Sequence, residues 1–127
     1  MWKWLQKARS KDLYLVRIEN GVSSGFADVF GYHKTEGAFF IELKQCITPK
    51  KRTSKLLFKI RQSQIIWHEK MRSLDANSWF LINIGRERYL FPSKFCESCR
   101  HLTIENSYLI KVSHLTPSKL IDFILKY

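Results

Sequence analysis

GFADVFGYHKTEGAFFIELKQ, the stretch from Gly25 to Gln45, decides the fold, because it contains two apolar runs joined by a short turn. Asp28 opens the first run, and the tripeptide Glu-Leu-Lys lies inside the second. Side chains alternate between the two faces of a strand, so we expect Glu42 and Lys44 on one face and their apolar neighbours on the other. A hairpin between the two runs would place Asp28 next to Glu42 and Lys44.

Two carboxylates and one ammonium group held together on a sheet are costly for structure alone. Charged groups are seldom buried unless another charge compensates them. A divalent cation would supply the missing positive charge, and Mg²⁺ prefers oxygen ligands such as carboxylates. The pattern therefore predicts a site for Mg²⁺, or for Mn²⁺ in its place, at the Asp28–Glu42 pair.

The pattern resembles the signature of the PD-(D/E)XK nuclease superfamily, which is an aspartate, a variable spacer and then (D/E)-x-K. Further elements extend the resemblance over roughly Tyr14 to Phe91. They are similar to small phage-encoded members related to the VRR-NUC domain and to Holliday-junction resolvases. Ala27 departs from this pattern, because these proteins usually have proline there. The matching elements are Arg17-Ile18-Glu19-Asn20, Val22, Gly25, Gln64-x-x-Trp67 and Tyr89-Leu90-Phe91.

The resemblance implies an α+β fold, like an α/β sandwich, with a restriction-endonuclease-like core in one domain (1–127). Its centre would be a mixed β-sheet of about five strands flanked by helices. Periodicity predicts strands at 13–18, 26–32, 38–45, 79–84 and 88–91, and 107–112 alternates again. Helices are expected at 2–7, at 62–74 and after Thr116, which would cap a helix with Pro117 at its first position.

The resemblance also implies the roles of the residues in the motif. Phosphodiester hydrolysis needs an activated water and neutralisation of the charge that develops on the phosphate, and a carboxylate-held Mg²⁺ supplies both. Asp28 and Glu42 would be the metal ligands, with the backbone carbonyl of Leu43 as a further ligand. Lys44 would lie beside the water or the scissile phosphate and stabilise negative charge.

Residues outside the motif each have two interpretations. Glu19 matches a glutamate that binds a second metal or its water, or it is an exposed glutamate at a strand end. Gln64 matches a glutamine that positions the lysine or a phosphate, or it is a surface residue. Trp67 is expected to pack in the core rather than to stack on a base. His68 could reach the site, although a lone histidine in a helix is usually structural or solvated.

The charge of the chain indicates a polyanionic partner. It has 22 basic and 11 acidic residues, a net charge of +11, and a pI near 9.8. The range 43–68 contains no acidic residue, so phosphates would be drawn toward Lys44. The alternatives are a solvated loop or attraction to an anionic membrane, and we expect DNA rather than a membrane. The expected DNA-binding side chains are Lys50, Lys51, Arg52, Lys55, Lys59 and Arg61.

Three cysteines, an odd number, argue against a secreted disulfide scaffold and fit a reducing cytoplasm. Cys96 and Cys99 are spaced like zinc ligands, but only Cys46 and His114 could complete such a site and neither has the usual spacing. We interpret them as ordinary, partly buried thiols. No membrane span or signal peptide is recognisable, which predicts a cytoplasmic location, in the host cell if the protein is phage-encoded.

Together these features predict a metal-dependent DNA endonuclease acting on branched or junction DNA in phage DNA replication, recombination or repair. Cleavage of a symmetric junction needs two sites, so a homodimer is expected. One alternative is a nuclease for single-stranded, flap or nicked DNA, and RNA is a further possible substrate. Another is a non-catalytic basic DNA-binding accessory protein. No serine-hydrolase elbow or phosphate-binding glycine loop is present to support other enzyme classes.

Overall fold

A mixed six-stranded sheet forms the centre of the structure, and its strands lie side by side in chain order. This computed structural model describes residues 1–18, 25–106 and 108–127, without the side chain of Ser98. β3 and β4 are parallel, and all other neighbouring strands are antiparallel. The strands are β1 (Leu13–Arg17), β2 (Val29–His33), β3 (Gly37–Cys46), β4 (Ser78–Ile84), β5 (Glu87–Pro92) and β6 (Ile110–Lys111).

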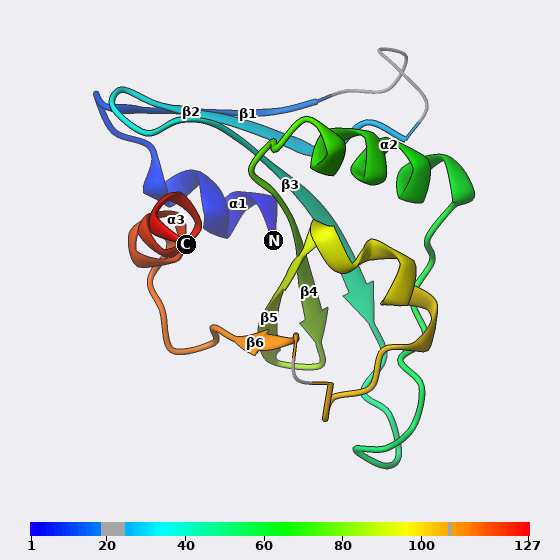
Figure 1. The fold of residues 1–127 in the computed structure, drawn as a ribbon. Coiled ribbons are helices and arrows are strands. Elements are labelled where there is room, and N and C mark those ends of the chain that lie inside the picture. The colour runs from blue at the N-terminus through cyan, green and yellow to red at the C-terminus, as the bar shows by residue number, and fades with distance from the viewer. Residues whose placement is uncertain (19–24, 107) are drawn as a thin grey trace.

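Helices cover both faces of the sheet, which gives three layers (Figure 1). α1 (Trp2–Leu5), the 3₁₀ helix η1 (Gln6–Ala8) and α3 (Pro117–Lys126) pack on one face. α2 (Gln62–Ser73) and the 3₁₀ helix η2 (Ser93–His101) pack on the other. Each interface between layers has its own apolar core, as expected when a sheet buries both faces. No helix in the described part of the chain is long and apolar enough to span a bilayer.

β3 separates apolar from charged side chains by strand alternation. Phe39 and Ile41 are fully buried in the core beneath α1 and α3. Glu42 and Lys44 point to the opposite face, where α2 covers them, and both are almost completely buried. The predicted separation of these side chains is observed, and it places two charged groups in an interior layer.

The parallel pairing of β3 with β4 explains why α2 lies over the charged pair. Parallel strands need a crossover connection, here the segment that contains α2. In this pairing Glu42 lies opposite Phe80, and Lys44 lies opposite Ile82. β4 is buried along almost its whole length, as predicted for a central strand covered on both faces.

Two glycines with positive φ illustrate different local demands. Gly25 has a φ of +81°, and a Cβ there would lie 2.1 Å from the backbone oxygen of Ser63. The segment leading to Asp28 therefore packs directly on the start of α2, and only glycine permits this approach. Gly37 has a φ of +85° as the first residue of β3, but nothing lies within 4 Å of the position that a Cβ would take there.

The predicted α+β fold with a central mixed sheet is confirmed, with six strands instead of about five. The predicted cap of α3 is also observed, because Thr116 Oγ1 accepts a hydrogen bond from the Lys119 N–H at 3.3 Å. The strand expected at 107–112 is shorter in the described part of this segment, where β6 covers Ile110–Lys111 and pairs with β5. Asn106 starts a turn there: its Oδ1 accepts from the Tyr108 N–H at 2.8 Å. This local bond replaces a strand pairing.

Candidate active site

Asp28 lies at the point where the pairing of β2 with β3 ends. Val29 is opposite Ile41, so the same register places Asp28 opposite Glu42. The Leu43 N–H donates to Asp28 Oδ2 at 2.8 Å, so a carboxylate takes the position of a ladder partner. A strand residue presents its N–H and its carbonyl to the same neighbour, and the Leu43 carbonyl therefore faces the side on which Asp28 lies.

The Glu42 carboxyl group is surrounded by polar partners although it is only 1% exposed. Gln64 Nε2 donates to its Oε2 at 3.2 Å, and His68 Nε2 lies 3.4 Å from its Oε1. Lys44 Nζ lies 3.9 Å from Oε2. Burial, together with a hydrogen bond and like charge from Asp28, raises the pKa of Glu42 to about 9. The negative charge of Asp28 thus disfavours the ionised form of Glu42.

Gln64 connects the lysine to the glutamate. Its Oε1 accepts from Lys44 Nζ at 2.8 Å and from the Arg61 N–H at 3.0 Å, while its amide nitrogen donates to Glu42. Burial lowers the pKa of Lys44, and the negative charges of Glu42 and Asp28 oppose this shift. Gln64 is buried at the start of α2, so it is not the surface glutamine of the alternative interpretation.

His68 is a member of this cluster. The sequence allowed two interpretations of this residue, one in the site and one purely structural. It is fully buried, and in addition to its contact with Glu42 its Nδ1 lies 2.8 Å from Ser78 Oγ. Burial lowers its pKa to about 4, so the ring is uncharged at neutral pH. The available signal was spacing, because Gln64 and His68 are four residues apart and share one helix face. Trp67 packs against Phe26 and Phe40 with ring centroids 4.9 and 5.3 Å away, as expected of a packing residue.

The donor set of this cluster fits a hard divalent cation. Asp28 and Glu42 offer carboxylate oxygens, and the Leu43 carbonyl faces the same side; Mg²⁺ and Mn²⁺ bind oxygens of these types. A cation would also oppose the upward shift in the pKa of Glu42, because it stabilises the ionised carboxylate. Within the described residues no three His, Cys, Asp or Glu side chains form a metal-binding group. The third acidic candidate, Glu19, lies outside the described residues.

The two closely spaced cysteines are buried free thiols on the same side of the sheet as α2. Burial raises the pKa of Cys96 to about 11 and that of Cys99 to about 12. Both side chains are buried, whereas the sequence predicted partly buried thiols.

The predicted DNA-binding side chains are mostly exposed, and they follow β3 directly. The chain loops away from the sheet after β3 and returns to start α2 (Figure 1). Lys59 and Arg61 lie at the end of this segment, where they line a hollow of about 370 Å³ together with Lys44 and Gln64. The positive segment thus reaches the buried lysine. Its other members are Lys50, Lys51, Arg52 and Lys55.

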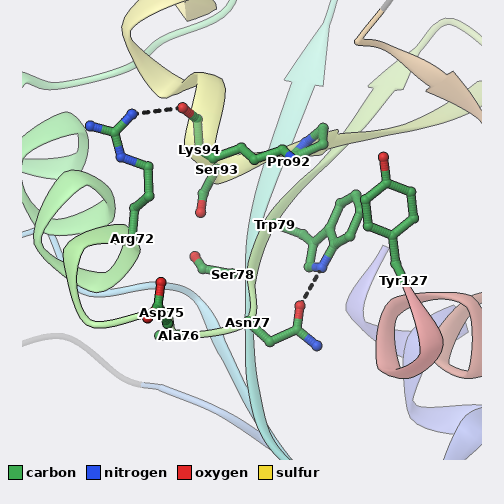
Figure 2. A pocket seen from close by; sticks show the side chains of 10 residues that line it. All are labelled: Arg72, Asp75, Ala76, Asn77, Ser78, Trp79, Pro92, Ser93, Lys94 and Tyr127. Atoms are coloured by element: carbon green, nitrogen blue, oxygen red, sulfur yellow. Dashed lines mark hydrogen bonds between the residues drawn. The ribbon is translucent and has the colours of Figure 1, made fainter.

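A larger hollow of about 510 Å³ lies between the end of α2, the start of β4 and the start of η2. Figure 2 shows its lining, which includes Ser78, Ser93 and Asp75. It has no pair of carboxylates, and its one acidic side chain, Asp75, is exposed. The volume of a hollow therefore does not identify the candidate active site. The grouping of Asp28, Glu42 and Lys44 does.

Comparison with known proteins gives a structural similarity only. No protein-family model matches the sequence, and no curated protein matches it. A solved structure with a similar arrangement is Hjc, a Holliday junction resolvase from the archaeal hyperthermophile Archaeoglobus fulgidus. The two chains are 16% identical, with a TM-score of 0.49 over 91% of this chain and 89% of that chain. The function proposed below therefore depends on the side chains of the site.

Proposed function

We propose that this protein is a divalent-metal-dependent DNA endonuclease whose site is built around Asp28, Glu42 and Lys44. The observation that supports this most is the convergence of two carboxyl groups from adjacent strands, one of which has its pKa raised to about 9. Strongly shifted pKa values in a cluster of this kind are typical of functional sites. The resemblance of the sequence to PD-(D/E)XK nucleases supports the same function.

In this proposal Asp28, Glu42 and the Leu43 carbonyl would hold Mg²⁺ or Mn²⁺. The bound cation would lower the pKa of a water molecule and polarise the scissile phosphate. Lys44 would stabilise the negative charge that develops on the phosphate. Gln64 would fix the direction of the Lys44 ammonium, and Glu19 would add a further acidic ligand.

DNA would reach the site along the positive segment that follows β3. Lysine and arginine side chains in exposed positions bind phosphates without regard to sequence. Lys59 and Arg61 are next to Lys44 in the smaller hollow, so a phosphate they bind would lie near the proposed metal ligands. This arrangement favours a substrate that is recognised by its backbone and shape.

The finer parts of the proposal are branched or junction DNA as substrate, a homodimer, and a cytoplasmic role in phage DNA replication, recombination or repair. A four-way junction, a flap, a nicked duplex and a single strand, offered in parallel, separate these substrates. Preferred cleavage of the junction supports the proposal. Preferred cleavage of the flap or the single strand supports the alternative nuclease, and an RNA duplex tests the choice of sugar.

The decisive comparison is between the wild type and Glu42→Ala, each with Mg²⁺ or Mn²⁺. We expect the wild type to cut DNA, and the variant to bind DNA without cutting it, because the positive segment is unchanged. Absence of cutting by both proteins, with binding retained, would favour the non-catalytic accessory protein. Equal cutting by both would overturn the assignment of the site.

A further inference from the structure

His68 joins Glu42 to a serine on a different strand. Its ring lies between α2 and β4, with Phe80 at a centroid distance of 4.4 Å and Trp67 at 4.9 Å. Its Nδ1 is 2.8 Å from Ser78 Oγ, and its Nε2 is 3.4 Å from Glu42 Oε1. The ring is therefore fixed by packing on its sides and by a polar contact at each nitrogen.

The proton positions in the row formed by Ser78, His68 and Glu42 follow from what each group can donate. A neutral imidazole has one N–H donor and one acceptor nitrogen. Metal binding needs the ionised form of Glu42, which is an acceptor only. Nε2 must then carry the proton and donate a hydrogen bond to Glu42. Nδ1 is left as the acceptor of a hydrogen bond from the Ser78 hydroxyl. The other tautomer would direct a nitrogen lone pair at a carboxylate oxygen.

We propose that Ser78 and His68 are positioning residues, which orient the Glu42 carboxylate for metal binding. This inference rests on the proposed function. Ser78 holds the His68 ring through Nδ1, and His68 holds Glu42 Oε1 while Gln64 holds Oε2. With one donor on each oxygen, the Glu42 carboxylate is held in one orientation, and each oxygen keeps a further lone pair for a metal ion.

Ser78 offers a clean variant because it touches neither the proposed metal nor the substrate. It is 5% exposed at the edge of the larger hollow, where Ser93, 3% exposed, is also found (Figure 2). In the described part of the chain Ser93 is not hydrogen-bonded to His68. Ser93→Ala therefore removes an equally buried hydroxyl from the same hollow and leaves the row intact.

The test measures Mn²⁺ affinity by electron paramagnetic resonance, and the His68 tautomer by ¹⁵N NMR with Mg²⁺ present. We expect Ser78→Ala to weaken Mn²⁺ binding about tenfold, within the range known for groups that orient metal ligands. Ser93→Ala should bind Mn²⁺ like the wild type. The wild-type ring should carry its proton on Nε2.

Substitutions of His68 test the donor directly. His68→Gln can place an amide N–H near the position of Nε2, whereas His68→Leu has no donor. We expect His68→Gln to retain more Mn²⁺ affinity than His68→Leu, with folding of both variants checked by thermal melting. If either fails to fold, the comparison of Ser78→Ala with Ser93→Ala decides alone.

The outcomes separate this inference from the nuclease proposal. If the wild type binds Mn²⁺ and cuts DNA, while Ser78→Ala binds Mn²⁺ as Ser93→Ala does, the roles of Ser78 and His68 are wrong and the nuclease stands. A wild-type ring protonated on Nδ1 in the presence of Mg²⁺ would overturn these two roles in the same way. If the wild type neither binds Mn²⁺ nor cuts DNA, both proposals are wrong.

Discussion

Lys44 Nζ donates a hydrogen bond to Gln64 Oε1 at 2.8 Å, although one residue belongs to β3 and the other to α2. The same amide donates to Glu42 Oε2 at 3.2 Å. One glutamine of α2 thus fixes the relative positions of the Lys44 and Glu42 side chains, which both belong to β3. The catalytic geometry that we propose depends on how α2 is seated on the sheet.

Gln64→Leu tests this link. The substitution keeps the side-chain volume but leaves Lys44 Nζ and one oxygen of Glu42 without their partner. We expect the rate of DNA cleavage to fall roughly 10- to 100-fold, as for other groups that orient active-site residues, while DNA affinity is unchanged. Gln62→Leu is the matched control, because Gln62 lies on the same helix, is exposed, and bonds Arg100 instead. Equal cleavage rates of the two variants would contradict the role of Gln64.

The raised pKa of Glu42 predicts a pH dependence of stability in metal-free protein. Between its ordinary value of 4.5 and about 9, the glutamate is ionised in the unfolded chain but protonated in the folded one. The folded state then binds more protons than the unfolded state. The contribution of Glu42 to the free energy of unfolding is therefore lost as pH rises through this window. In EDTA, the melting temperature of Glu42→Gln should rise relative to that of the wild type as pH increases from 5 to about 9.

The comparison removes the contributions of groups far from position 42, whereas nearby Asp28, Lys44, His68 and Arg61 interact with the charge that the substitution removes. Mg²⁺ should reduce the difference in melting temperature between Glu42→Gln and the wild type at high pH, because a cation stabilises the ionised carboxylate. A melting-temperature difference that stays constant over the whole pH range would show that Glu42 ionises normally in the fold.

Gly25→Ala should destabilise the protein far more than Gly37→Ala. Both glycines have a positive φ, but only the new Cβ at Gly25 would collide with a backbone oxygen, that of Ser63, at 2.1 Å. We expect a loss of about 1–2 kcal/mol at Gly37 from the backbone conformation, and roughly 2–4 kcal/mol at Gly25. Urea unfolding measures both. Similar losses would mean that the start of α2 does not contact this segment closely.

The salt dependence of DNA binding tests the positive segment. Each cation that neutralises a phosphate of duplex DNA contributes about 0.9 to the slope of log affinity against log salt. The double variant Lys59→Ala/Arg61→Ala should therefore reduce this slope by roughly 1–2. Lys3→Ala/Lys7→Ala removes two exposed cations from the helices on the other face of the sheet. An equal effect of both double variants would indicate a diffuse response to net charge.

The parts of the fold that follow from local rules could be predicted from the sequence. Strand alternation was enough to put Glu42 and Lys44 on one face, and the Thr116-Pro117 pair was enough to mark the start of α3. η2 was not predicted, because it consists of short 3₁₀ turns separated by non-helical backbone at Phe95, which are too short to produce a long apolar pattern.

The contacts of His68 could not be predicted for a different reason. The rotation of α2 on the sheet decides which side chains meet Glu42, and that rotation is set by packing between residues distant in the chain. The spacing of Gln64 and His68 shows that they share a helix face, but not which face is turned to the sheet. The role of Glu19 stays a prediction, because it lies outside the described residues.

The most direct test of the central claim is a crystal grown with Mn²⁺ and examined by anomalous scattering. We predict a peak between Asp28 and Glu42, within about 2.2 Å of an oxygen of each, the distance typical of hard divalent cations. A peak bound only by other residues, or carboxyl groups that point apart with no ion between them, would contradict the proposed metal site.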